Sequence, residues 1–140
     1  MEVILSLTAK QTNPGCEPEV IELITKGTLE RIENGWQICY KETDLTGLAG
    51  VTTKFRLEGD QVTLNRSGKL NSQMVFREGS SHNSLYEMEF GALMISVSAK
   101  LVRYDITENG GTVDLVYTIE IEQTDGGTIE YHLELNKENR

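Results

Sequence analysis

Residues that bind metals or form disulfides are scarce in this sequence, which has two cysteines and two histidines among 140 residues. Cys16 and Cys39 lie far apart and lack the spacing of a metal-binding or redox pair. His82 falls in a predicted polar loop and His132 on the outward face of the last predicted strand, so the two form no zinc pattern. We therefore predict no metal, no cofactor, and reduced cysteines in a cytoplasmic protein.

Basic residues are also few: the sequence has 13 Lys and Arg residues, 22 Asp and Glu residues, and a net charge of −9. Such a charge repels both nucleic acids and anionic membranes. Long apolar runs are missing as well, because no segment approaches the roughly 18 apolar residues of a membrane span. Residues 2–9 alternate where a signal peptide would be continuously apolar. The sequence thus predicts a soluble protein with no nucleic-acid or membrane partner.

Catalytic motifs are the third group of features that the sequence lacks. It contains no G-x-S-x-G element and no glycine-rich loop that opens a helix. Ser80 and Ser81 directly precede His82, but adjacency in sequence does not build a catalytic triad. Carboxylate pairs such as Glu87 with Glu89 fall on outward-facing positions. We therefore predict that the protein is not an enzyme.

What the sequence does have is an apolar residue at every second position along most of its length. This alternation is typical of strands with one buried and one solvated face. The predicted inward stripes are Val3–Ala9, Trp36–Tyr40, Val51–Leu57, Val62–Leu64, Met74–Phe76, Tyr86–Phe90, Leu93–Leu101, Val113–Ile121 and Ile129–Leu135.

Glycine-containing pairs and triplets separate these stripes and predict the turns. Asn34-Gly35 favours a two-residue hairpin turn, in which both residues take a positive φ. Gly59-Asp60 and the segments 109–111 and 125–127 are predicted turns of the same kind. Gly91 is either a tight turn or a sharp corner between two strands.

Residues 18–34 fit two kinds of structure. Acidic residues around Pro18, followed by Val20, Leu23 and Ile24, suit a capped helix. The β-branched content instead favours a long bent strand, with a bulge where Gly27 interrupts the run. We favour the strand.

About ten short strands with regularly spaced turns predict an all-β fold. The chain length suits one domain covering residues 1–140. Short connections between consecutive strands favour an antiparallel up-and-down arrangement, and closure into a barrel removes the exposed edges. We predict a single up-and-down β-barrel of 8–10 strands.

Arg66 is out of place in this pattern, because it shares a face with Val62 and Leu64. A guanidinium stays charged, so in a barrel interior it needs an anion or a wet cavity. Gly68 follows closely, so Arg66 could reach solvent at the barrel rim. Alternatively, it could pair with Glu42 inside the barrel, or bind the acidic group of a ligand.

The barrel interior is therefore either a ligand site or a solid core. If it is hollow, a small amphipathic or anionic molecule could bind there, with tyrosine hydroxyls as donors and methionines as adaptable walls. If it is filled, the protein is a structural or protein-interaction module. An enzyme on such a barrel is a third alternative, although no chemistry is indicated. The candidate lining residues are Arg66, Tyr40, Glu42, Met74, Phe76, Tyr86, Met88, Tyr117 and Tyr131.

The segment 65–100 resembles the YwiB-like family of small bacterial proteins. The resemblance rests on a series in order: Arg66-Ser67-Gly68, Met74, Phe76, Gly79, Tyr86 and Phe90-Gly91. It implies a lipocalin-like, or calycin-like, β-barrel whose function is unassigned. It implies no catalytic residue and no particular ligand.

Overall fold

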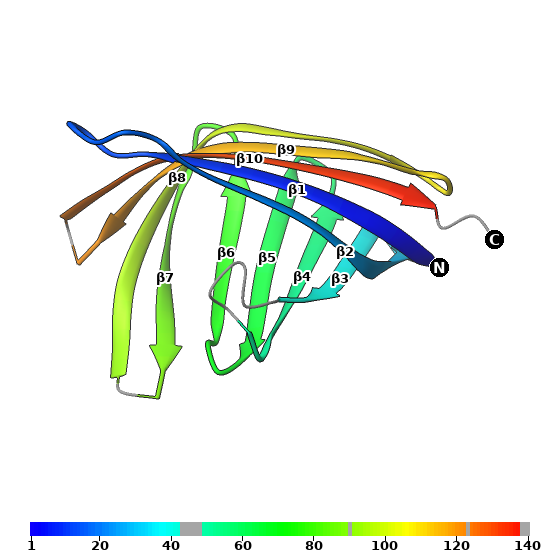
Figure 1. The fold of residues 1–140 in the computed structure, drawn as a ribbon, viewed down its shortest axis with the longest axis horizontal. Helices are drawn as coiled ribbons and strands as arrows, with labels where there is room; N and C mark the ends of the chain where they lie inside the picture. Colours follow the sequence, from blue (N-terminus) through cyan, green and yellow to red (C-terminus); the bar gives the residue numbers. More distant parts are fainter. Residues whose placement is uncertain (43–48, 90, 123, 138–140) are drawn as a thin grey trace.

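The protein is an all-β sheet structure, described here from a computed structural model that covers the chain except residues 43–48, 90, 123 and 138–140. Every strand pairs antiparallel with its neighbours in one ten-stranded sheet, and no helix occurs in the described residues (Figure 1). Accordingly, none of the described segments is a helix able to cross a membrane. The strands are β1 (Glu2–Thr12), β2 (Glu19–Ile32), β3 (Gly35–Lys41), β4 (Val51–Glu58), β5 (Gln61–Gly68), β6 (Ser72–Arg77), β7 (Ser81–Met88), β8 (Gly91–Thr107), β9 (Gly110–Ile121) and β10 (Thr124–Lys137).

The sheet curls into a nearly closed up-and-down barrel, as the sequence predicted. Its strand order is β6-β5-β4-β3-β2-β1-β10-β9-β8-β7, so the first and last strands of the chain are paired. The break lies instead between β6 and β7, which are consecutive in sequence. In the described part of the chain, their only ladder pair is the bridge between Asn71 and Glu87. We call this break the β6–β7 seam.

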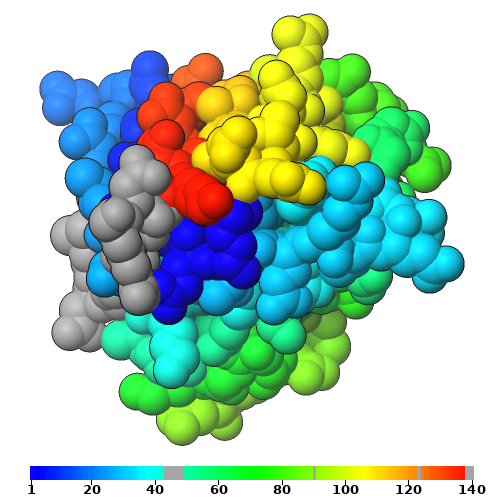
Figure 2. Space-filling model, turned by 90° about the vertical axis from the view of Figure 1, so that its right-hand side faces the viewer, coloured from blue at the N-terminus to red at the C-terminus, as the bar shows by residue number. Residues whose placement is uncertain are grey.

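The long strands β1, β2, β9 and β10 and the second half of β8 lie across the shorter strands β3–β6, with β7 and the first half of β8 at one side (Figure 1). The β1–β2 connection lies at the same end of the barrel as the end of β9 and the start of β10 (Figure 1). Figure 2 looks onto the other end, where the start of β1 lies beside the end of β10 and the β8–β9 turn. The two ends of the barrel therefore differ, and the candidate site lies at the end with the β1–β2 connection.

Most residues of the predicted inward stripes form the core, but Leu93 and Ile121 are exposed, so the prediction is wrong for them, and Phe90 lies outside the described residues. Val3, Leu5 and Leu7 of β1 are buried, as are Leu133 and Leu135 of the paired strand β10. The side chains of Phe55 and Phe76 are fully buried. Their rings contact tyrosines from the opposite wall, with ring centroids 5.6 Å apart for Phe55 and Tyr131 and 4.7 Å apart for Phe76 and Tyr117. Side chains thus fill most of the barrel from wall to wall.

Within residues 18–34 the chain forms strand β2 and not a helix, because β1 pairs with residues 19–28 and β3 pairs with residues 27–32. The predicted bulge at Gly27 is wrong, since the pairing continues through it without a register shift. A Cβ atom on Gly27 would lie 2.6 Å from the carbonyl oxygen of Cys39, so the residue permits close strand contact. The stripe that was predicted to end at Leu101 changes face earlier, at a bulge between Ala99 and Leu101. Beyond the bulge, Val102, Tyr104 and Ile106 pack against the core.

Several predicted turns lie one or more residues away from their expected place. Ile32 pairs with Gly35, so the β2–β3 turn is Glu33-Asn34, and Gly35 begins β3 without a positive φ. A Cβ atom there would lie 1.7 Å from the carbonyl oxygen of Leu57, which only glycine avoids. The segments 109–111 and 125–127 likewise contribute their glycines to strands, and the pairing of β10 shifts register between Asp125 and Thr128. The Gly59-Asp60 turn is confirmed, and Gly91 begins β8 with a φ of 139°.

Candidate functional site

A cavity of about 180 Å³ lies inside the barrel at the end with the β1–β2 connection. Five of the nine candidate side chains line it: Arg66, Met74, Tyr86, Tyr117 and Tyr131. The other lining residues are Ala9, Gln11, Glu19, Ile21, Ile95, Ile119 and Ile129. The wall is therefore mainly aliphatic and aromatic, with one cationic side chain.

Arg66 belongs to a polar row that crosses the inner face of four neighbouring strands. The register places Tyr40 of β3 opposite Thr53 of β4, Thr53 opposite Arg66 of β5, and Arg66 opposite Ser72 of β6. Each of these side chains has a polar tip, so the row interrupts the apolar core. The alternation predicted that Arg66 faces inward, but it did not predict the row, because the row depends on pairing between distant segments.

The guanidinium of Arg66 has one direct polar partner among the described residues. Its Nη1 donates a hydrogen bond to the hydroxyl of Tyr86 at 3.2 Å, across the β6–β7 seam. Its Nε atom is buried and has no hydrogen-bond partner. The side chain is half-buried overall, so it lies in the inner wall and keeps some access to solvent.

A direct ion pair between Arg66 and Glu42 is not part of the described structure. Glu42 is buried, and its carboxylate accepts a hydrogen bond from the hydroxyl of Thr53, which is the neighbour of Arg66 in the polar row. The charge of Glu42 still acts on Arg66 at longer range. Desolvation lowers the pKa of Arg66, but the nearby tyrosines and Glu42 outweigh this effect and raise it. Arg66 is therefore a fixed positive charge.

Two tyrosines of the cavity, Tyr117 and Tyr131, are neutral at physiological pH. Burial raises the pKa of Tyr117 to about 12 and raises that of Tyr131 well above its usual range. Their hydroxyl groups can therefore donate hydrogen bonds without carrying charge. The cavity thus combines one permanent cation with neutral donors and apolar walls.

The remaining candidate residues lie near the cavity without lining it. The hydroxyl of Tyr40 is hydrogen-bonded to the hydroxyl of Tyr131, with the two oxygen atoms 2.9 Å apart. Phe76 is fully buried behind Tyr117. Met88 is half-buried and ends β7, where it pairs with Gly91. Of these, Tyr40 supports a lining residue by a polar contact and Phe76 belongs to the core, whereas Met88 belongs to neither the core nor the cavity wall, so its prediction as a lining residue is wrong.

Three further polar atoms on the strands beside the seam are buried without hydrogen-bond partners: the hydroxyls of Ser72 and Ser84, and Nδ1 of His82.

His82 belongs to strand β7, so the prediction of a polar loop there is wrong. The error arises because a segment rich in Ser, Asn and His has the composition of a loop. Pairing with β8 nevertheless makes the segment a strand.

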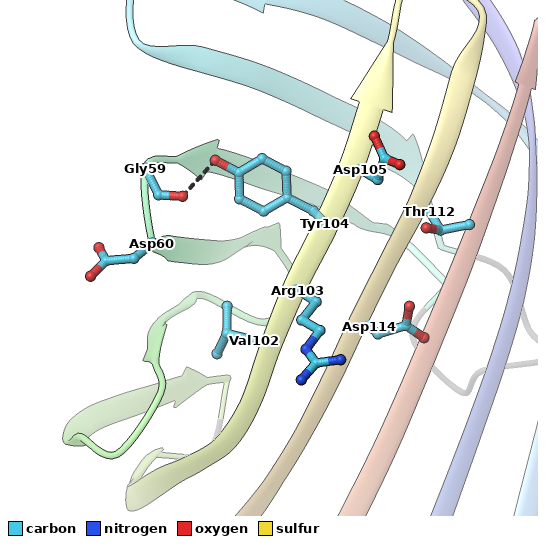
Figure 3. A pocket seen from close by; sticks show the side chains of 8 residues that line it. All are labelled: Gly59, Asp60, Val102, Arg103, Tyr104, Asp105, Thr112 and Asp114. Atoms are coloured by element: carbon cyan, nitrogen blue, oxygen red, sulfur yellow. Dashed lines mark hydrogen bonds between the residues drawn. The ribbon is translucent and has the colours of Figure 1, made fainter.

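A second and larger hollow, of about 630 Å³, lies between the β4–β5 turn and strands β8 and β9. Figure 3 shows Tyr104 reaching from β8 to the turn, where its hydroxyl donates a 2.7 Å hydrogen bond to the carbonyl oxygen of Gly59. Arg103 lies beside Asp114, its cross-strand partner (Figure 3). The hollow is an open groove with charged walls, and no pattern in the sequence indicates it. Within the described residues, no group of three or more acidic, histidine or cysteine side chains is placed to hold a metal ion.

His132 lies on the outer surface between two carboxylates. Its Nδ1 is hydrogen-bonded to Asp114, and its Nε2 lies 3.2 Å from a carboxylate oxygen of Glu134. The hydrogen bond to Asp114, and then that to Glu134, raise the pKa of His132 above its usual value. The cluster is half-exposed, and its Asp114 also lines the groove of about 630 Å³.

This arrangement predicts that His132 stabilises the protein in acid and not in base. The folded state holds the proton of His132 more tightly than the unfolded state does. The contribution is therefore complete below about pH 6.5, the unperturbed pKa, and is lost as the pH rises through the raised pKa. Because the side chain is 40% exposed, we expect less than about 1 kcal/mol.

Urea unfolding of the protein and of His132→Gln at pH 6 and pH 9 measures this effect. The difference in free energy of unfolding should be largest at pH 6 and vanish at pH 9. A difference that is the same at both pH values would contradict the prediction.

Comparison with known proteins places the chain among proteins of similar architecture. A family model described as "Domain of unknown function (DUF1934)" matches residues 5–137. The chain is similar to the "Uncharacterized beta-barrel protein YwiB" of Bacillus subtilis (strain 168), with 29% identity over 103 residues, 74% of this chain and 71% of that protein. Its structure is similar to the crystal structure of the ywiB protein from Bacillus subtilis, with a TM-score of 0.87. That match has 23% identity and covers 99% of this chain and 92% of the other. At this identity the structural match shows the fold, and it agrees with the nearly closed barrel described above.

Proposed function

We propose that this chain, which belongs to the DUF1934 domain family, binds a small amphipathic or anionic molecule in the cavity of about 180 Å³ inside its barrel. The observation that carries this proposal is the state of Arg66. Its guanidinium lines the cavity, its charge is fixed, and its buried Nε lacks a hydrogen-bond partner. A buried cationic donor without an acceptor is unfavourable, and an anion in the cavity would supply the acceptor.

The walls of the cavity favour the amphipathic kind of ligand. Opposite the charge lie aliphatic side chains, among them Ile21, Ile119 and Ile129. Ile21 is 38% exposed although it lies in phase with the buried Leu23, so apolar surface remains accessible at this end of the barrel. A ligand with an acidic group and an apolar body would satisfy both parts of the site.

We propose binding rather than catalysis because of how the cavity residues titrate. General acid–base catalysis works best with a group whose pKa lies near the working pH. Arg66, Tyr117 and Tyr131 all have pKa values raised away from neutrality. They are suited to hold an anion and not to exchange protons with it. The cytoplasmic location expected from the two cysteines stays a prediction, as does the lipocalin-like character of the barrel.

A filled barrel that serves as a structural or protein-interaction module is the second candidate function. It is favoured by the size of the cavity, which is below the roughly 300–1,000 Å³ of usual ligand pockets. Fully buried side chains such as Phe55, Phe76 and Leu57 occupy much of the remaining interior. On this alternative, water molecules would occupy the cavity.

Native mass spectrometry of the freshly purified protein distinguishes the two functions. If the barrel is a binding site, the native mass should exceed the denatured mass by one small molecule, and Arg66→Met should lose it. A bare native mass, together with no stabilisation by any molecule in a metabolite-scale thermal-shift screen, would favour the filled barrel.

A further inference from the structure

We infer that the ligand is a compact monocarboxylate, with its carboxylate on the free edge of Arg66 and a single small ring or branched chain against the isoleucines. This inference rests on the proposed function and adds the chemical class of the ligand. Three features of the described residues lead to it: the charge balance of the cavity, the orientation of the guanidinium, and the size and shape of the apolar part.

The charge balance selects a single negative charge. Arg66 is the only basic side chain that lines the cavity among the described residues. Glu42 lies close enough to raise the pKa of Arg66, so part of the positive potential is already offset. Glu19 is a further lining residue and adds negative charge at the β2 end of the cavity. A dianion such as a phosphate monoester would therefore meet more negative than positive charge, whereas a monoanion is balanced by Arg66.

The guanidinium selects a carboxylate through its geometry. Nη1 is occupied by its hydrogen bond to Tyr86. Nε is without a hydrogen-bond partner but has almost no exposed surface, so a carboxylate would reach this edge of the guanidinium only after a small displacement of the side chains that cover it. A carboxylate fits an arginine edge with two parallel hydrogen bonds, one from Nε and one from the adjacent terminal nitrogen.

Tyr86 can add one more hydrogen bond to the same acid group. Its hydroxyl oxygen accepts from Arg66, and its proton points to the sulfur of Met74 at 4.0 Å, a weak acceptor. A carboxylate oxygen would be a stronger acceptor for that proton. The three donors would then converge on one acid group.

The cavity volume limits the apolar part. A cavity of about 150 Å³ with aliphatic and aromatic walls accommodates benzene, and the present cavity of about 180 Å³ is slightly larger. One ring, or a branched chain of similar size, therefore fits beside the carboxylate. The tail of a long-chain fatty acid exceeds this volume, so most of it would lie outside the cavity.

Isothermal titration calorimetry at pH 7.5 with four matched probes tests this class. Phenylacetate should bind. The neutral alcohol 2-phenylethanol and the dianion phenyl phosphate should each bind about 10- to 100-fold more weakly, because each loses charge-assisted hydrogen bonds or adds repulsion. Hexadecanoate should also bind at least about tenfold more weakly, because its chain exceeds the cavity.

Two variants separate the geometry of Arg66 from its charge. Arg66→Lys keeps the charge but loses the paired donors, so its affinity for phenylacetate should fall about tenfold or more. Arg56→Met is the matched control, because Arg56 lies on the outer face of β4 with its side chain 48% exposed and beside Glu58. Its affinity should not change.

The outcomes distinguish failure of the class from failure of the function. Equal binding of 2-phenylethanol, or tighter binding of phenyl phosphate or hexadecanoate, would overturn the monocarboxylate and leave a ligand-binding barrel. If none of the four probes binds, the class is overturned. The proposed function falls with it only if the native mass of the purified protein is also bare.

Discussion

Replacement of Arg66 by methionine should reduce the affinity for phenylacetate at least about 100-fold while the barrel keeps its fold. The loss follows from two charge-assisted hydrogen bonds, each worth about 1.5–3 kcal/mol, because about 1.4 kcal/mol corresponds to a factor of ten. Methionine has a similar length and no charge, so it can pack against the aliphatic wall. Calorimetric titration of the variant measures the loss directly.

The stability of the same variant tests why Arg66 lies in the barrel wall. Within the described residues its guanidinium contacts no carboxylate, so its removal should leave the free energy of unfolding unchanged or raise it. A loss of about 3 kcal/mol or more would instead mean that Arg66 is an essential partner of the buried Glu42. That result would replace ligand binding with a structural role.

The largest loss of stability is expected from Phe55→Ala. Phe55 has no exposed surface, and its ring contacts Tyr40 and Tyr131, with ring centroids 6.5 Å and 5.6 Å away. Removing a buried phenylalanine ring costs about 3–5 kcal/mol, because the transfer free energy is lost and a cavity remains. This is a large part of the roughly 5–15 kcal/mol that stabilises a typical domain. Urea unfolding, followed by circular dichroism, measures it.

Ile24→Ala is the matched control for that experiment. Ile24 also lies on a strand, but it is 74% exposed on the outer face of β2. Its replacement should change the free energy of unfolding by no more than about 0.5 kcal/mol. Comparable losses for the two variants would contradict the placement of the core inside the barrel.

The sequence predicted most of the fold because alternation is a local signal. The stripes Val3–Leu7 and Leu133–Leu135 face inward as expected, and their strands pair to join the two ends of the chain. The choice of strand for residues 18–34 was also confirmed. The propensity of β-branched residues agreed there with pairing on both sides, which a helix would have lost.

What the sequence did not predict depends on contacts between distant segments. Gly35 looks like a turn residue, but its place is set by the carbonyl group of Leu57 on the next strand. The bulge near Ala99 moves Val102 onto the inner face, and no local pattern indicates it. The break in the sheet lies in the hairpin between β6 and β7, where short sequence separation would favour pairing.

Only part of the candidate site was predicted, again because the rest depends on contacts between distant segments. Alternation placed Arg66 and Tyr131 on the inner face, but it could not decide which end of the barrel stays open. Ile119 and Ile129 belong to predicted inward stripes, and such stripes predict ordinary core residues. Glu19 and Gln11 carry no signal in the sequence, because they reach the cavity only through the pairing of β1 and β2. The role of all these residues in ligand binding stays a prediction.

A crystal structure of the protein grown with phenylacetate would test the central claim most directly, namely that Arg66 anchors an anion inside a hollow end of the barrel. The account predicts a carboxylate within about 3 Å of Nε of Arg66, with the ring between Ile119 and Ile129. A cavity filled by side chains, with Arg66 turned to solvent or paired with Glu42, would contradict it.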